Sequence, residues 1–116
     1  MKIYSKDILK AILWASIEDY CGLWELVWEI NSLNLNLPQK ESQYAALQCM
    51  LYLTSKDFVR LFYCQEPYGK MTEIDDINSY PNLLHNSKAW APPLPKARSI
   101  RVAATKAGER YYGDIT

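Results

Sequence analysis

The sequence predicts an α+β fold with three N-terminal helices, two antiparallel strands joined by a long arm, and a short C-terminal helix. Three observations indicate this fold. Apolar residues recur at helical spacing through the first half of the chain. Residues 57–64 alternate between two sides, which is typical of a strand. A second apolar run, 99–104, passes directly into Thr105, a residue type that often begins a helix.

The first half of the chain contains three helical segments separated by breaks. Ser5 is a candidate N-cap, and Asp7 adds negative charge to the first turn. Cys21 and Gly22 predict a break, and the asparagine-rich stretch 31–38 predicts a connection. The helices are expected at residues 5–20, 23–30 and 39–55. The third is expected to turn inward Tyr44, Leu47, Met50, Leu51 and Thr54.

The second half of the chain is expected to form a two-stranded wing. Residues 65–97 are rich in proline and predict a long arm with at most one short helical piece. The return strand, 99–104, is expected to face the first strand across this arm. Thr105 then caps the final helix, and Gly108 in its first turn indicates close approach to the sheet or to another helix.

The junction between the last strand and the last helix carries a family resemblance. It consists of Ala104, Thr105, Lys106, Ala107 and Gly108. This Thr-x-x-Gly, together with the order of elements over most of residues 5–112, resembles the winged-helix domains of bacterial regulators such as the PadR and MarR families. There the last wing strand commonly leads into L-T-x-x-G and a further helix. Ala104 in place of the leucine and the long arm in place of a short wing depart from that pattern.

The resemblance implies that the third helix enters the DNA major groove. Ser42, Gln43 and Gln48 are the candidate residues on that helix, because glutamine can read adenine. However, the helix has no Lys or Arg between Glu41 and Ser55. The cationic contacts to phosphate that dominate DNA affinity are therefore missing from it.

The resemblance also implies that the wing touches the DNA backbone. Lys96, Arg98 and Arg101 form the strongest basic run and lie on the return strand, so they are the other DNA-binding candidates. A solvated strand edge, on which basic residues discourage pairing with another sheet, explains the same run.

Aromatic residues suggest a different function. The chain has four tryptophans and nine tyrosines. Trp14, Trp24 and Trp28 can form an exposed ridge on the first two helices, and exposed aromatic patches mark protein interfaces. The alternative for each tryptophan is burial in the core. We favour a protein-interaction or oligomerising module, of the immunity or regulatory-partner type, over a DNA-binding transcriptional regulator.

Composition restricts the remaining function classes. The chain has 116 residues and no net charge, so we expect one domain spanning 1–116 with no general attraction to polyanions or membranes. The charge is nevertheless uneven, because residues 17–30 carry four acidic and no basic side chains. The N-terminus does not read as a signal peptide, and no apolar run is long enough to span a bilayer. A cytoplasmic protein is expected.

The sequence shows no catalytic or cofactor-binding constellation. His85 lies in the arm with no nucleophile linked to it, and no glycine-rich nucleotide loop is present. Cys21, Cys49 and Cys64 are widely spaced, and with one histidine they do not match a zinc site. We expect buried, reduced thiols, and a protein that is not an enzyme and needs neither a metal nor a cofactor.

Overall fold

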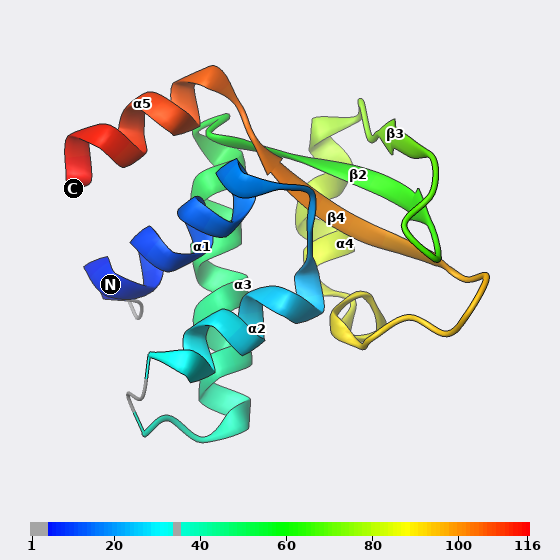
Figure 1. The fold of residues 1–116 in the computed structure, drawn as a ribbon, viewed down its shortest axis with the longest axis horizontal. Coiled ribbons are helices and arrows are strands. Elements are labelled where there is room, and N and C mark those ends of the chain that lie inside the picture. The colour runs from blue at the N-terminus through cyan, green and yellow to red at the C-terminus, as the bar shows by residue number, and fades with distance from the viewer. Residues whose placement is uncertain (1–4, 34–35) are drawn as a thin grey trace.

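The computed structural model describes residues 5–33 and 36–116 and has the mixed α+β architecture that the sequence predicts. Figure 1 shows α1, α2 and α3 gathered beside a twisted antiparallel sheet, with α5 at one end. The elements are α1 (Lys6–Glu18), β1 (Cys21–Gly22), α2 (Leu23–Ser32), α3 (Gln39–Ser55), β2 (Val59–Gln65), β3 (Met71–Glu73), the 3₁₀ turn η1 (Ile77–Ser79), α4 (Tyr80–His85), the 3₁₀ turn η2 (Ser87–Trp90), β4 (Arg98–Ala104) and α5 (Lys106–Ile115). Part of the predicted 31–38 connection, residues 34 and 35, lies outside the described residues.

The sheet has the strand order β1-β4-β2-β3, and all neighbouring strands are antiparallel. The predicted wing strands β2 and β4 form its centre, with Leu61 opposite Val102. The break predicted at Cys21 and Gly22 is strand β1, and Gly22 lies opposite Arg101 of β4. Because β1 lies between α1 and α2, this pairing ties the N-terminal helices to the sheet.

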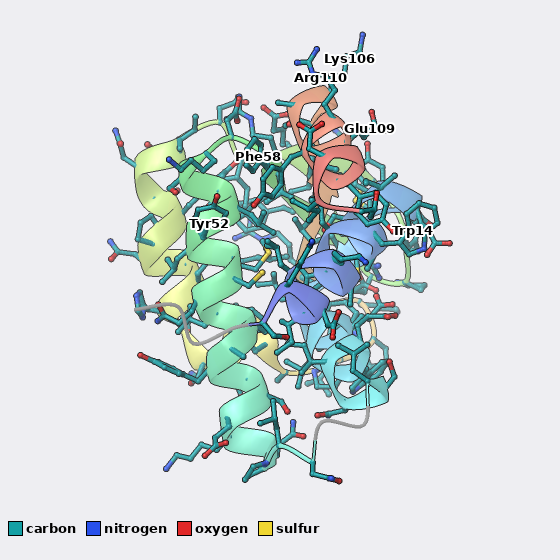
Figure 2. All side chains as sticks on the ribbon, turned by 90° about the vertical axis from the view of Figure 1, so that its left-hand side faces the viewer. Trp14, Tyr52, Phe58, Lys106, Glu109 and Arg110 are labelled. Atoms are coloured by element: carbon teal, nitrogen blue, oxygen red, sulfur yellow. The ribbon has the colours of Figure 1, made fainter. Side chains whose placement is uncertain are left out.

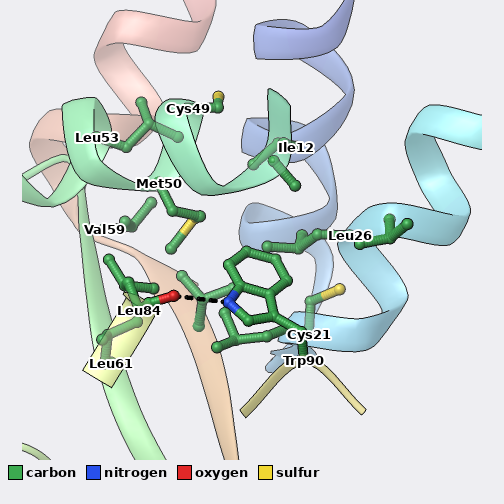
Figure 3. Packing of buried hydrophobic residues seen from close by; sticks show 14 of the residues in the cluster. Ile12, Cys21, Leu26, Cys49, Met50, Leu53, Val59, Leu61, Leu84 and Trp90 are labelled. Carbon is green, nitrogen blue, oxygen red and sulfur yellow. Dashed lines mark hydrogen bonds between the residues drawn. The ribbon is translucent and has the colours of Figure 1, made fainter. Parts of the chain in front are cut away.

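One face of the sheet and the first three helices enclose the core. From the sheet, Val59, Leu61 and Val102 are fully buried. Ile12, Leu26 and Met50 reach the same cluster from α1, α2 and α3 (Figure 3). Burial of side chains of this size stabilises the fold by about 1.5–3 kcal/mol each.

The arm is folded onto the core and is not an extended loop. The Tyr80 hydroxyl donates to the Ile74 carbonyl at 2.7 Å and accepts from the Leu61 amide at 3.1 Å. The indole of Trp90 is buried beside Met50 and donates to the Leu84 carbonyl at 2.8 Å (Figure 3). These two buried aromatic residues satisfy their polar atoms within the arm and the sheet, so they anchor the arm.

The third helix presents a different face to the core from the one expected. Tyr44 is predicted inside but is 53% exposed, whereas Met50 and Thr54 are buried as predicted. Apolar residues occur around most of this helix, so their spacing alone does not decide its orientation. The buried face consists of Ser42, Ala45, Ala46, Cys49, Met50, Leu53 and Thr54.

Both predicted helix N-caps are confirmed. The hydroxyl of Ser5 accepts a hydrogen bond from the Ile8 amide at 3.2 Å. The hydroxyl of Thr105 accepts from the Gly108 amide at 3.1 Å and donates to the Asp57 carbonyl at 2.7 Å. The second contact fastens the start of α5 to the start of β2.

Candidate protein-interaction site

A buried arginine lies at the centre of the candidate site. Arg101 is on the sheet face opposite the core, with its Cα paired to that of Phe62. Arg101 is only 6% exposed, and its guanidinium carbon lies 5.1 Å from the ring centre of Trp24 and 4.5 Å from that of Tyr68. Aromatic faces at this range attract a cation electrostatically. The strand thus places a charged side chain against two aromatic rings.

Two carboxylates neutralise this arginine. Its Nη2 lies 3.2 Å from Oε1 of Glu66, and its Nε donates to Oε2 of the same carboxylate at 3.3 Å. Its Nη1 lies 3.3 Å from Oε1 of Glu25 and donates to the Tyr20 carbonyl at 3.0 Å. Arg101 therefore connects α2, β4, the residue before β1 and the turn after β2.

The turn after β2 covers the arginine. The Tyr68 hydroxyl donates to Oδ1 of Asp19 at 2.5 Å, and the Ser99 hydroxyl donates to Oε2 of Glu66 at 2.6 Å. Burial favours the neutral form of Glu66, but hydrogen bonds from Arg101 and Ser99 outweigh it and lower the pKa of Glu66 to about 2. Glu66 is therefore a carboxylate over the whole physiological range.

The lowered pKa of Glu66 predicts acid-sensitive folding. Its ordinary pKa is 4.5, so between pH 4.5 and 2 the unfolded chain binds a proton that the folded chain does not. The resulting stabilisation is complete above pH 4.5 and is lost as the pH falls toward 2. Urea unfolding across this window should show a falling free energy of unfolding. Glu66→Gln should flatten this fall and Glu73→Gln should not, because Glu73 is half-exposed and 3.9 Å from Arg60. Equal slopes in all three proteins would contradict the assignment.

An acidic hollow of about 480 Å³ opens beside the Arg101 cluster. Besides Arg101, it is lined by the rings of Tyr20 and Tyr68. Four carboxylates also line it: those of Glu18, Asp19, Glu25 and Glu29. Within the described part of the chain, Glu18 and Glu29 form no ion pair. The hollow therefore keeps excess negative charge although it contains an arginine.

The three tryptophans predicted to form a ridge lie in different environments. Trp28 is 57% exposed and stands on α2 within one turn of Glu25 and Glu29. Trp24 is 8% exposed, because it packs on Gly22 and under Arg101. Trp14 is 46% exposed and lies 5.5 Å from Tyr112 between ring centres. The expected Trp24–Trp28 ridge is therefore not formed, and Trp14 and Trp28 are the exposed members of the set.

The DNA-binding candidates are not gathered on one surface. On α3, Ser42 is fully buried, and Gln43 and Gln48 are half-buried. On the wing, Lys96 and Arg98 are exposed, but Arg101, which was expected to be a surface cation, is buried and ion-paired. On α3 the physical reason is the arm, because its helix α4 packs along α3 and covers part of that helix's surface. Figure 2 shows the two helices side by side.

The remaining predicted features are placed as follows. Cys21, Cys49 and Cys64 are buried free thiols, and burial raises the pKa of Cys21 and of Cys49 to about 12. His85 is exposed at the end of α4. In the described ranges, no group of three His, Cys, Asp or Glu side chains is arranged to hold a metal ion. The helices found there also include none that is long and apolar enough to cross a membrane.

Comparison with known proteins adds no relative. No family model, curated protein or solved structure matches the chain.

Proposed function

We propose that this chain is a non-enzymatic, winged-helix-like protein-interaction module, of the immunity or regulatory-partner type. It binds a positively charged segment of a protein partner on the surface formed by Trp28 and the acidic hollow. The observation that carries the proposal is the 57% exposure of Trp28 next to Glu29, whose carboxylate forms no ion pair with the described residues. Tryptophan anchors dominate many interfaces, and surface carboxylates attract and orient a basic partner.

The arrangement of strands supports the winged-helix part of the proposal. The antiparallel pair of long strands β2 and β4 corresponds to the wing, and β4 leads through Thr105 into α5. The folded arm, with β3, η1, α4 and η2, replaces the short wing loop. Three free, buried thiols fit the cytoplasmic location that the sequence predicts.

The second candidate function is DNA binding through the wing. Lys70, Lys96 and Arg98 are exposed at its far end, and Arg98 stacks on the Tyr63 ring at 3.9 Å. These cations can contact phosphate. We rank this function second because Arg101 is occupied by Glu25 and Glu66, and because α4 flanks the helix that would read bases.

Affinity purification from the source cells, with quantified recovery, tests the first function. Trp28→Ala is expected to weaken binding of a partner by at least about tenfold, since it removes a central aromatic anchor. Glu29→Lys should also weaken binding, because it reverses charge at the rim of the hollow. Tyr44→Ala is the matched control, as Tyr44 is 53% exposed and lies on a different helix. Circular dichroism should show that all three variants remain folded.

Two outcomes would overturn this proposal. One is a partner that Trp28→Ala and Glu29→Lys retain as well as the parent does. The other is micromolar binding to random duplex DNA that weakens steeply with salt and is lost in the Lys96→Glu/Arg98→Glu variant, since this is the signature of phosphate neutralisation.

A further inference from the structure

A single exposed stripe on α1 has opposite charges at its two ends. Lys10, Trp14 and Glu18 are spaced four residues apart, so they lie one above another on the same side of the helix. Trp14 is 46% exposed, Glu18 is exposed and Lys10 is half-exposed. None of the three forms an ion pair with the described residues. The two charged ends of the stripe are therefore not neutralised by the described residues, and Trp14 stands exposed between them beside Tyr112.

A groove runs beside this stripe. It has a volume of about 330 Å³ and is lined by Asp7, Lys10, Ala11, Trp14, Leu33 and Tyr112. Figure 2 shows Trp14 projecting outward from α1, on the side away from α3 and next to α5. A bulky aromatic side chain has the size and character to fill such a space.

We propose that the occupant is a second copy of this chain, whose α1 packs antiparallel against the first. A two-fold axis at Trp14 places the position four residues before it opposite the position four residues after it. Lys10 then faces Glu18 of the partner subunit, and Glu18 faces Lys10 of the partner subunit. A parallel arrangement would instead oppose identical charges. The charge pattern of the stripe thus selects the antiparallel dimer.

This inference rests on the proposed function, because it names one protein partner, but it is centred on Trp14 and shares only Glu18 with the acidic hollow. The contact is built on one helix with the neighbouring Tyr112, so its area falls at the small end of specific interfaces. We therefore expect dissociation in the micromolar range, on the order of 1–50 µM. Such a dimer engages Glu18 at the edge of the acidic hollow but leaves Trp28 and Glu29 available for another partner.

A charge-swap series, measured by sedimentation velocity from about 1 to 200 µM, tests the dimer. Lys10→Glu and Glu18→Lys should each weaken dimerisation by about tenfold or more, since each leaves like charges opposed in both pairs. The double variant Lys10→Glu/Glu18→Lys should dimerise as the parent does. An equimolar mixture of the two single variants should form heterodimers more tightly than either variant dimerises alone. The heterodimer shows that the stripe charges lie at the interface, whereas weakening by each single reversal relative to the parent depends on the antiparallel pairing, since a parallel parent would already oppose like charges.

Two tryptophan variants complete the test. Trp14→Ala should be monomeric over the same range, whereas Trp28→Ala should dimerise normally, because Trp28 does not line this groove. Circular dichroism on each variant separates lost association from lost folding. A parent that stays monomeric at the highest concentration would overturn the dimer. A dimer that is indifferent to both charge reversals would also overturn it. Either result leaves the partner-binding assay at Trp28 to be decided separately.

Discussion

Replacing Arg101 by methionine is expected to lower the free energy of unfolding by about 3 kcal/mol. Methionine keeps an unbranched side chain against the rings of Trp24 and Tyr68, but it leaves the carboxylate of Glu66, a side chain only 10% exposed, without a cation. An unpaired charge in such a position is far more destabilising than the absence of the whole pair. Urea unfolding at neutral pH measures the change.

The same strand provides the control for this prediction. Arg98 also stacks on a tyrosine, with its guanidinium carbon 3.9 Å from the centre of the Tyr63 ring, but it is exposed. Arg98→Met should therefore change the free energy of unfolding by less than about 0.5 kcal/mol. Removing both charges, in Arg101→Met/Glu66→Leu, should recover much of the loss. If Arg101→Met is as mild as Arg98→Met, the buried cluster does not stabilise the fold.

Elements whose signals are local could be predicted from the sequence. The caps at Ser5 and Thr105 depend on one hydroxyl and a backbone amide three residues on, so the residue type and its position suffice. The strand at Val59–Gln65 shows its alternation over seven residues without reference to any partner. In each case the determining interactions lie within a few residues of one another.

Elements that depend on distant partners could not be predicted in the same way. β1 is two residues long, and it is a strand only because Cys21 pairs with Val102. The arm contains few apolar residues at regular spacing, and its order comes from Tyr80 and Trp90 entering a core built by other segments. Short segments of this kind have no periodicity to detect.

The candidate site shows the same division. Arg101 stands between Ile100 and Val102 in an apolar strand, and the acidic stretch 17–30 contains no Lys or Arg. These two anomalies, taken together, could have suggested a buried ion pair. The exposure of Trp28 and the burial of Trp24 could not be inferred, because Trp24 is buried by contacts with Gly22 and Arg101, and Arg101 is distant in the sequence.

Gly108→Ala is expected to lower the free energy of unfolding by roughly 2–3 kcal/mol. A Cβ atom at this position would lie 2.0 Å from the backbone carbonyl oxygen of Phe58. That oxygen accepts from the Thr105 amide at 3.0 Å, and the Phe58 ring stacks on Tyr111 at 4.3 Å between centres. Relieving the clash therefore requires α5 to move away from β2. The sequence predicts that Gly108 permits a close approach of the last helix to the sheet or to another helix. The contact with the Phe58 carbonyl at the start of β2 confirms this prediction.

Gly113 in the same helix provides a control of opposite sign. A Cβ atom there meets nothing within 4 Å, so Gly113→Ala should raise the free energy of unfolding by about 0.5 kcal/mol through helix propensity alone. Thermal and urea unfolding of the two variants compare one chemical change in two environments. A stabilising effect at both positions would mean that α5 can withdraw from Phe58 without loss. The Thr-x-x-Gly junction would then not hold the last helix against the sheet.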